Sequence, residues 1–339
     1  MALLDFFRRT NLTDRQEAAV MKTLQSLRSQ RRNRFRILAC IDGSEEAMIT
    51  VRFAAQLAAS NSCDIIILYV RPIDMGLHSG GLQVRLARQN MIDAGFELPG
   101  VSHLKKSLEI LKAEGIDVSG WTHTGTHEES WGDAAGDTKV EYISPEGRSV
   151  VLKLKTAPDE AGGILDQYEL GPYNLMILGK PSRWRSELRA FFGAGITQTV
   201  TTMSPCSVLV ARNSFDRHGY FICTDGSSRS LQAVRRSAVL AAMTGQPITL
   251  FSAAPDAEAL PAAEEAVNNA KALLKAMKID VADVKTAVGD VIEEIVERGS
   301  LYRMIVVTDE GRSRLERLLK GSRATDVVRL ARTSVLDVR

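Results

Sequence analysis

Tyr220-Phe-Ile-Cys-Thr-Asp-Gly-Ser227 decides the fold of this 339-residue chain, because it combines an apolar strand with a polar turn. The same pattern occurs 183 residues earlier, as Ile37-Leu-Ala-Cys-Ile-Asp-Gly-Ser44. Each turn is followed by a segment with apolar residues at helical spacing and then by a second apolar strand. Strand, helix and strand of this kind indicate a βαβ unit in a parallel sheet that is covered on both faces.

The ends of the two copies repeat as well. Pro205-Cys-Ser-Val-Leu-Val-Ala-Arg212 aligns with Arg332-Thr-Ser-Val-Leu-Asp-Val-Arg339 at an offset of 127 residues. Matched starts and ends in the same order indicate a tandem duplication, in which the first copy is 56 residues longer than the second. We therefore predict an N-terminal helical extension at 1–33, a first domain at 34–213 and a second domain at 217–339.

The second copy predicts a doubly wound α/β domain, because its apolar runs alternate with amphipathic segments to give five strands and four helices. In such a sheet, ligands bind at the carboxyl ends of the strands, where the strand order reverses. The first and fourth strands end in Thr224-Asp-Gly-Ser227 and Thr308-Asp-Glu-Gly311, so we expect these two segments to meet.

A glycine-bearing loop follows the fourth strand. Nine residues separate Gly311 from Gly321-Ser322, and an amphipathic segment at 323–331 comes next. This layout suits phosphate, because backbone N–H groups at a helix N-terminus carry partial positive charge and glycine leaves room for a polyanion. Loop geometry without any ligand explains the same glycines, so the motif alone leaves both interpretations open.

The extra length of the first copy lies largely between about 119 and 157. Residues 138–143 and 149–156 both alternate in polarity around a Ser-Pro-Glu-Gly-Arg turn, which predicts an inserted β-hairpin. His123 and His127 in the same insert raise the alternative of a zinc site. No cysteine lies near enough to complete such a site, and we predict no metal site.

The N-terminal extension predicts one helix, from about 14 to 29, followed by a basic run at 28–36. We interpret the run as a solvated linker beside a helix that docks on a domain or on a second subunit. An anchor for RNA or anionic lipid is the alternative, but the run lacks a repeated basic and aromatic pattern.

Composition and net charge limit which partners and which cellular compartment we expect for this protein. The formal net charge of +2 gives no general argument for nucleic acid or an anionic membrane, so neither is expected as a partner. No apolar run approaches the roughly 20 residues that span a bilayer. The first residues lack the pattern of a signal peptide, and the four cysteines form no CxxC pair. We therefore expect a cytoplasmic protein without a disulfide framework.

These features together resemble the universal stress protein family. The resemblance rests on the strand that ends in Asp-Gly-Ser, the late glycine loop and the last strand of the Pro-Cys-x-Val-Leu-Val type, and it covers about 34–339 except the insert. It implies that each copy folds as a five-stranded parallel α/β sandwich with strand order 3-2-1-4-5. Many members bind ATP, and others bind no nucleotide. Members pair through their last strands, which a tandem member can do within one chain or with a second chain.

The resemblance also implies a set of nucleotide contacts in the second copy. Gly311, Gly321 and Ser322 match the family loop, whereas Thr308 stands where the family has its first glycine. The implied contacts with ATP or AMP, with or without Mg²⁺, are Thr224, Asp225, Ala253, Val307, Thr308, Glu310, Gly311, Gly321, Ser322 and Arg323.

The first copy departs further from the family loop. It keeps Gly179, but Ser182 stands at the second glycine position and Ala194-Gly195 at the final Gly-Ser positions. We expect this copy to bind nucleotide poorly or not at all. Asp337 replaces Val210 in the last strand, and a charge on an edge strand discourages further pairing, so we also expect Asp337 to limit association.

The function implied is that of a stress-response sensor or regulator, which binds an adenine nucleotide in its second copy and presents a surface to an unidentified protein partner. The alternative is a scaffold without nucleotide, which uses the insert and the N-terminal helix as contact surfaces. A dedicated enzyme is not expected, because the chain has no Gly-x4-Gly-Lys-Ser/Thr loop and no evident metal clamp, which leaves a slow ATPase at most.

Overall fold

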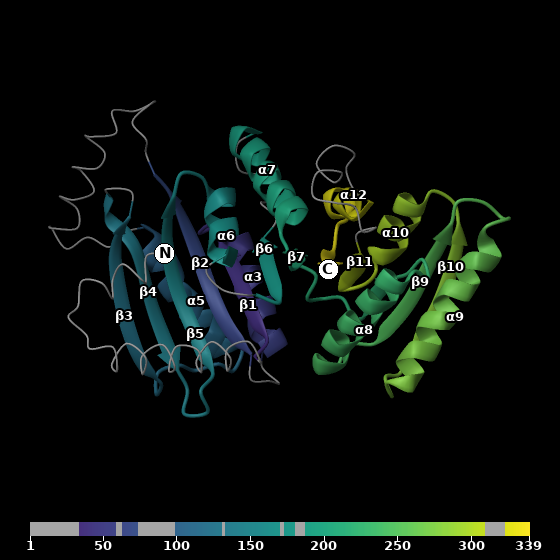
Figure 1. Cartoon of the computed structure of the whole chain (residues 1–339), viewed down its shortest axis with the longest axis horizontal. Helices are drawn as coiled ribbons and strands as arrows, with labels where there is room; N and C mark the ends of the chain where they lie inside the picture. Colours follow the sequence, from purple (N-terminus) through teal and green to yellow (C-terminus); the bar gives the residue numbers. More distant parts are fainter. Residues whose placement is uncertain are drawn as a thin grey trace, which may run out of the picture. The chain divides into compact units, whose positions relative to one another are not determined.

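The structure is a computed structural model that describes residues 34–58, 63–73, 99–130, 133–169, 173–179, 187–308 and 323–339 (Figure 1). Residues 36–339 form one compact unit. The expected helix at 14–29 lies outside the described residues. Within the described part of the chain, no helix is long and apolar enough to cross a membrane.

The first repeat contains seven described strands and four described helices. In chain order they are β1 (Arg36–Ile41), α3 (Glu45–Ala58), β2 (Asp64–Pro72), α5 (Pro99–Ala113), β3 (Thr122–Ser130), β4 (Asp133–Ile143), β5 (Ser149–Ala157), α6 (Glu160–Glu169), β6 (Leu175–Gly179), α7 (Glu187–Met203) and β7 (Ser207–Ala211). Burial on both faces explains why the central strands are continuous apolar runs, because every residue from Ile37 to Ile41 in β1 is at most 8% exposed.

The second repeat contains five described strands and four described helices. They are β8 (Tyr220–Cys223), α8 (Ser228–Met243), β9 (Ile248–Ala254), α9 (Leu260–Ala276), β10 (Asp283–Val288), α10 (Val291–Gly299), β11 (Met304–Thr308), α12 (Arg323–Leu330) and β12 (Ser334–Val338). Each of the first four strands is followed by a helix that returns the chain to the amino ends of the strands, as the alternating pattern predicts.

All twelve described strands lie in one mixed sheet. Its order is β10-β9-β8-β11-β12-β7-β6-β1-β2-β5-β4-β3. The five strands of the second repeat, β10-β9-β8-β11-β12, all pair in parallel. Five strands of the first repeat, β7-β6-β1-β2-β5, also pair in parallel. Helices pack on the sheet in both repeats, with α3 against β1 and α9 against β9.

The expected hairpin is present, because β4 and β5 pair antiparallel around the turn at 144–148, but only one of its two strands is additional to the domain. Residues 149–156 belong to β5, which pairs in parallel with β2 and takes the place that β10 has in the second repeat. The additional element is therefore β3 with β4, joined to the outer side of β5 by antiparallel pairing. The sequence indicated the hairpin but not the parallel partner of its second strand, because an alternating run next to a turn is compatible with both pairings.

The two repeats meet through their last strands. β7 and β12 pair antiparallel, with Leu336 opposite Leu209 and Asp337 opposite Val208. Asp337 is 1% exposed, and its Oδ2 lies 3.1 Å from Nη2 of Arg339. The expectation that Asp337 limits association as a charge on an edge strand is therefore wrong, because pairing with β7 places it inside the sheet.

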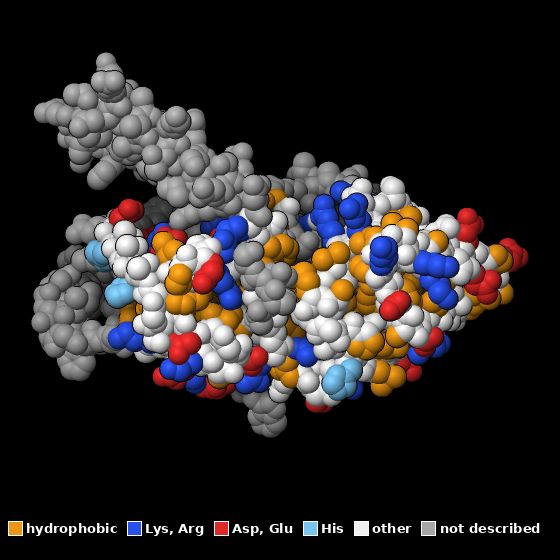
Figure 2. All heavy atoms as spheres, turned by 90° about the horizontal axis from the view of Figure 1, so that it is seen from below, with side chains coloured by type: hydrophobic (Ala, Val, Ile, Leu, Met, Phe, Trp, Pro, Cys, Tyr) orange, Lys and Arg blue, Asp and Glu red, His pale blue; other side chains and the backbone are white. Residues whose placement is uncertain are grey.

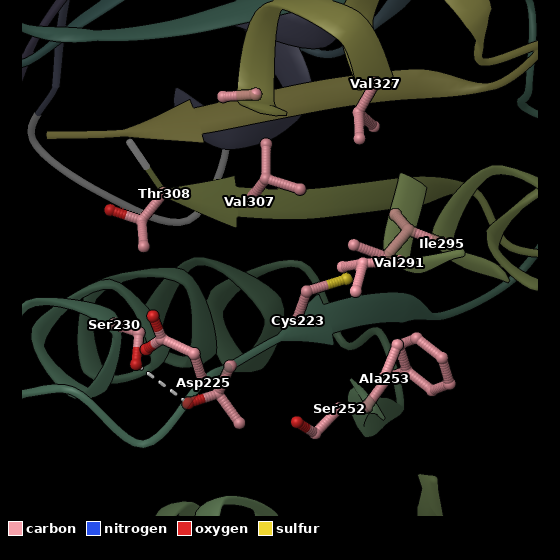
Figure 3. Close-up of a pocket in the computed structure, with 13 residues that line it drawn as sticks. Cys223, Asp225, Ser230, Ser252, Ala253, Val291, Ile295, Val307, Thr308 and Val327 are labelled. Carbon is pink, nitrogen blue, oxygen red and sulfur yellow. Dashed lines mark hydrogen bonds between the residues drawn. The ribbon is translucent and has the colours of Figure 1, made fainter. Parts of the chain in front are cut away.

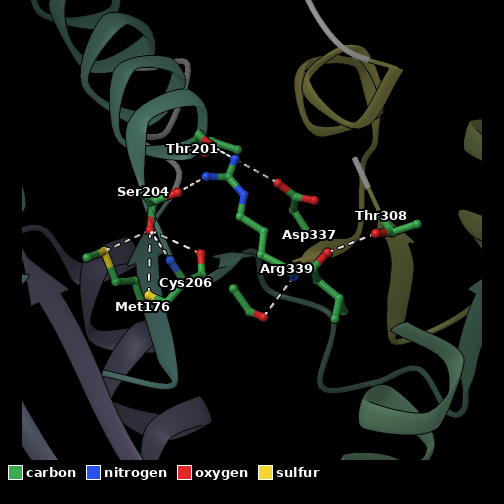
Figure 4. A network of polar contacts seen from close by, with 9 residues as sticks. Met176, Thr201, Ser204, Cys206, Thr308, Asp337 and Arg339 are labelled. Carbon is green, nitrogen blue, oxygen red and sulfur yellow. Dashed lines mark hydrogen bonds and ion pairs between the residues drawn. The ribbon is translucent and has the colours of Figure 1, made fainter. Parts of the chain in front are cut away.

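Two arginines reinforce this junction in a reciprocal way. The Arg212 guanidinium donates to the carbonyl of Val328 in α12. The Arg339 guanidinium donates to the carbonyl of Thr201 in α7 (Figure 4). Arg212 and Arg339 are equivalent in the two repeats, as are Thr201 and Val328. A cation at the end of a helix satisfies carbonyls that lack an intrahelical partner and complements the helix dipole. Each repeat thus caps the last helix of the other.

The linker between the repeats is held by aromatic packing. The ring of Phe215 lies 4.7 Å from that of Phe53, measured between centroids. The guanidinium carbons of Arg52 and Arg303 lie 5.2 Å and 4.9 Å from the centroid of Phe215. Cation–π contacts of this kind fix the linker against both repeats.

On the face in Figure 2, basic and acidic side chains are interspersed with apolar ones, in agreement with the net charge of +2.

The junction between the repeats should be a principal source of stability. Leu336 is 1% exposed at its centre, so Leu336→Ala is expected to lower the free energy of unfolding by about 3 kcal/mol. Leu330→Ala, at a side chain that is 48% exposed, is the matched control and should change it by less than about 0.5 kcal/mol. Urea denaturation followed by circular dichroism measures both, and equal losses would show that the junction is not a special contributor.

Candidate functional site

A pocket of about 100 Å³ lies at the carboxyl ends of β8, β9 and β11 (Figure 3). This volume is several times the 10–15 Å³ or so that one water molecule needs. The lining residues come from these strands and from α8, α10 and α12: Cys223, Thr224, Asp225, Ser230, Phe251, Ser252, Ala253, Val291, Ile295, Val307, Thr308, Ala324 and Val327. The expected meeting of the first and fourth strand ends is therefore observed at Asp225 and Thr308.

The Asp-Gly-Ser turn is built by local hydrogen bonds. The backbone N–H of Ser227 donates to Oδ1 of Asp225 at 2.9 Å, and Ser227 caps α8 by accepting from the N–H of Ser230 at 3.2 Å. Gly226 has a φ of +79°, and a Cβ there would come within 3.1 Å of Ala266 in α9. Only glycine meets both conditions without strain, so the turn fixes where the Asp225 carboxylate stands.

Thr224 lines the pocket, but its hydroxyl group is already hydrogen-bonded within the protein. It is 6% exposed, and its Oγ1 lies 3.0 Å from Oγ of Ser230. Its Oγ1 also accepts from the N–H of Gly226 at 3.2 Å. Ser230 was not among the predicted residues, although its place three residues after the N-cap indicates that it faces the start of the helix.

Asp225 supplies the negative charge of the pocket. Its side chain is exposed, and in Figure 3 it lies with Ser230 and Thr308 at one end of the pocket. Partial burial raises the pKa of the carboxyl, but hydrogen bonds from Ser227 and Ser230 together outweigh it and bring the pKa below its ordinary value. Asp225 is therefore an ionised acceptor at neutral pH.

The opposite end of the pocket is apolar. Val307 is 5% exposed and Ile295 is 8% exposed, and they face the half-buried Ala253 across the space. Val291 and Ile295 come from α10 and were not predicted. The spacing of four between them places both on one face of that helix, but the sequence does not say which cavity that face closes.

Among the predicted residues from Thr308 to Arg323, two are described by the structure and four are not. Thr308 is half-buried, and its hydroxyl donates to the carbonyl of Val338 at 2.9 Å, so the threonine at the first family position is tied to the last strand. Arg323 is the first residue of α12, and only its backbone is described. Glu310, Gly311, Gly321 and Ser322 lie outside the described residues.

The first repeat has the same turn, but a larger side chain packs on it. The N–H of Ser44 donates to Oδ1 of Asp42 at 2.9 Å, as in the second repeat. A Cβ on Gly43 would come within 2.5 Å of Nε2 of His103, so the imidazole of His103 packs directly on the turn. The Tyr69 ring stacks on His103 at 5.8 Å and stands where the second repeat has Ser252. The residues of this repeat's own loop, 180–186, lie outside the described part.

The zinc alternative at His123 and His127 finds no support in the geometry. Both residues lie in β3, four positions apart on one face, which separates their Cα atoms by about 13 Å. Within the described residues, no group of three or more metal-ligating side chains converges. His127 instead has Nδ1 3.1 Å from Oγ1 of Thr138 on the neighbouring strand.

The chemistry that the pocket offers is binding. An apolar wall accepts a flat ring, and a carboxylate at the mouth accepts hydrogen bonds from hydroxyl groups. The thiol of Cys223 lines the pocket, but burial raises its pKa well above its usual range, so it stays protonated and is a poor nucleophile.

Comparisons with known proteins point to one family. The family model for universal stress proteins matches residues 33–212 and 221–339. No curated protein sequence matches the chain. A universal stress protein structure from Archaeoglobus fulgidus is 13% identical, covers 90% of this chain and 98% of its own, and has a TM-score of 0.57. A candidate universal stress protein from Pseudomonas aeruginosa is also 13% identical, with 91% and 94% covered and a TM-score of 0.56. At this identity, the two structures show the shared fold alone.

A third structure overlaps one repeat only. It is a universal stress protein in complex with cAMP, 28% identical over 36% of this chain and 97% of its own, with a TM-score of 0.31. An overlap of this extent carries no weight for the ligand of the present chain.

The lowered pKa of Asp225 predicts a pH-dependent contribution to stability. Because the folded pKa lies below the unfolded one, the contribution is present above about pH 4 and is lost as the pH falls through the folded pKa. The difference in melting temperature between wild type and Asp225→Asn should therefore shrink from about pH 6 to about pH 3. Asp280→Asn, at an exposed position outside the pocket, is the control. A difference that does not change with pH would contradict the stabilising hydrogen bonds.

Proposed function

The chain belongs to the universal stress protein family, and we propose that its second repeat binds an adenine nucleotide, ATP or AMP, as a cytoplasmic stress-response sensor. The observation that carries this proposal is the pocket at the ends of β8, β9 and β11, which has an apolar wall at one end and the Asp225 carboxylate at the other. The equivalent turn of the first repeat is covered by His103, so the proposal assigns one site to each chain.

The pocket suggests how the nucleotide is oriented. Adenine is proposed to lie against Val307, Ile295 and Ala253, where apolar side chains exclude water from both ring faces. The ribose hydroxyls are proposed to donate to Asp225, because an ionised carboxylate is an acceptor only. The same negative charge repels phosphate, so the phosphates are directed away from it.

The phosphates are proposed to lie on the loop that contains Gly311 and Gly321-Ser322. This loop leads directly into α12, and a helix N-terminus attracts anions through its free N–H groups. Mg²⁺ would accompany the phosphates of ATP and neutralise their charge. Thr308, at the entrance to the loop, keeps its hydroxyl on Val338 and leaves the phosphates to backbone groups.

The site fits a sensor better than a catalyst. Phosphoryl transfer needs a metal clamp and a positioned base or water. Among the described pocket residues, Asp225 is the ionised group, and it lies in the Asp-Gly-Ser turn that positions the ribose. Nucleotide binding is proposed to change the surface that the protein presents to a protein partner. Steady ADP production above the buffer rate would instead support a slow ATPase.

The role of Asp225 can be tested against its counterpart in the first repeat. Asp225→Asn removes the charged acceptor for ribose, so the Kd for AMP and ATP in isothermal titration calorimetry is expected to rise at least about tenfold. Asp42→Asn is the matched control, because it changes the same turn in the repeat whose edge is covered by His103. An unchanged Kd for Asp225→Asn, or equal losses in both variants, would place the site elsewhere.

The glycine loop provides a second test. Gly311→Val adds a branched side chain where the phosphates are proposed to approach the backbone, and it is expected to abolish measurable ATP binding. Gly120→Val is the control, because a Cβ there meets no atom within 4 Å. If the wild-type protein shows neither released adenine nucleotide on denaturation nor a thermal shift with ATP, the scaffold alternative without nucleotide replaces the proposal.

A further inference from the structure

Strand β3 forms one edge of the twelve-stranded sheet (Figure 1). Every residue from Thr122 to Glu128 is exposed. An edge strand presents a row of backbone N–H and C=O groups that can template another strand, and natural proteins block such edges with charged side chains, especially lysine, with proline or with β-bulges. In β3 the charge of Glu128 and the bulge between Glu128 and Ser130 lie at one end of the strand, beyond the segment around Gly125. The opposite edge, β10, carries Lys285, whereas β3 contains neither lysine nor proline.

The sequence of β3 is symmetric about Gly125. It has Thr124 and Thr126 on either side, and then His123 and His127. Antiparallel pairing reverses one of the two strands, so residues 123–127 each face a residue of the same kind in a second copy of the strand, whereas Thr122 faces Glu128. In this register Thr124 of each copy faces Thr126 of the other, and Thr–Thr pairs directly opposite each other stabilise a sheet. A second copy of this chain is therefore an occupant that the edge fits.

Contacts among the described residues do not explain the glycine at the centre of this strand. Gly125 is not among the glycines with positive φ, and the nearest atom to a Cβ placed there is the carbonyl oxygen of Lys139, at 4.0 Å. A larger residue would therefore fit without strain and would favour the strand. A glycine within a strand often marks the close approach of another backbone, and at Gly125 such an approach can come from the open edge.

Charges on the neighbouring strand do not oppose the same arrangement. Within the chain, Thr126 is opposite Lys139 of β4, and Thr124 is opposite Glu141. If two β3 strands pair around Gly125, each row across the interface contains Lys139, Thr126, the partner's Thr124 and the partner's Glu141. Lys139 and the partner's Glu141 are then three strand spacings apart, or about 14 Å. Within each chain, Nζ of Lys139 lies 2.6 Å from Oε2 of Glu141, so these two charges are balanced inside each copy.

We propose that β3 pairs antiparallel with β3 of a second copy of this chain, centred on Gly125, so that two twelve-stranded sheets join at this edge. The interface is isologous, because one two-fold axis relates both copies. It differs from the pairing of β7 with β12, which both lie inside the sheet of one chain and leave no free edge there. It also does not depend on nucleotide.

Disulfide cross-linking tests the register directly. Gly125→Cys places two thiols opposite each other on the axis, with Cα atoms about 4.5–5.5 Å apart, which a disulfide can bridge. Thr122→Cys is the control, because its two copies would be separated by about 20 Å, or six residues. The double variant Thr122→Cys with Glu128→Cys restores opposite thiols. The native cysteines are largely buried, so wild type gives the background.

Under mild oxidation, non-reducing gels are expected to show covalent dimer for Gly125→Cys and for the double variant, and background for Thr122→Cys. Equal cross-linking of Gly125→Cys and Thr122→Cys would overturn the register. A lack of cross-linking in Gly125→Cys, with wild type sedimenting as a monomer across the concentration series, would overturn the interface.

Charge substitutions test the same interface without new cysteines. Thr124→Lys with Thr126→Lys places like charges opposite each other twice, and it should raise the dimer Kd measured by analytical ultracentrifugation about tenfold or more. Thr124→Lys with Thr126→Glu places opposite charges instead, and it should keep dimerisation at or above the wild-type level. Within the chain, these two new charges also face Glu141 and Lys139 favourably. A dimer with the same Kd in both variants would place the contact elsewhere, and a melting curve for each variant separates loss of pairing from loss of fold.

Discussion

The antiparallel pairing of β7 with β12 is the interaction on which the rest of this structure depends. A parallel α/β sheet ends in edge strands with unpaired backbone groups, and the duplication would double that number. Pairing the two last strands removes one edge from each repeat and joins the two sheets into one. The reciprocal caps from Arg212 and Arg339 follow from the same symmetry, because each arginine extends from a last strand toward the last helix of the other repeat.

The same local turn has different neighbours in the two repeats. The Asp-Gly-Ser turn is preserved in both repeats, with the same hydrogen bond from serine to aspartate. What differs is what packs against the turn: Ala266 in the second repeat and His103, stacked on Tyr69, in the first. A small side chain packs against one turn, and the first of two stacked rings packs against the other. The proposed restriction of nucleotide to the second repeat therefore rests on neighbouring side chains, and the turn itself is unchanged.

The additional hairpin changes the first repeat at its outer edge. By pairing with β5, strand β4 covers an edge that would otherwise be exposed, and it moves the free edge outward to β3. The new edge is polar, exposed and symmetric about Gly125, which differs from the charged edge at β10. An insertion of this kind can add an assembly surface without disturbing the pocket in the other repeat, because the two lie at opposite ends of the strand order.

The sequence by itself determined the repeat, the parallel strands and the meeting of Asp225 with Thr308, because these depend on local periodicity and on the topology of βαβ units. It did not determine which strand fills the third position of the first repeat, since 149–157 is compatible with two pairings, nor that Asp337 is buried by β7. Likewise, Ser230, Val291 and Ile295 could be placed on helix faces from the sequence, but not on one pocket. Those outcomes were decided only by the tertiary structure, because strand partners and cavity walls come from residues far apart in the chain, whose contacts leave no periodic signal in the sequence.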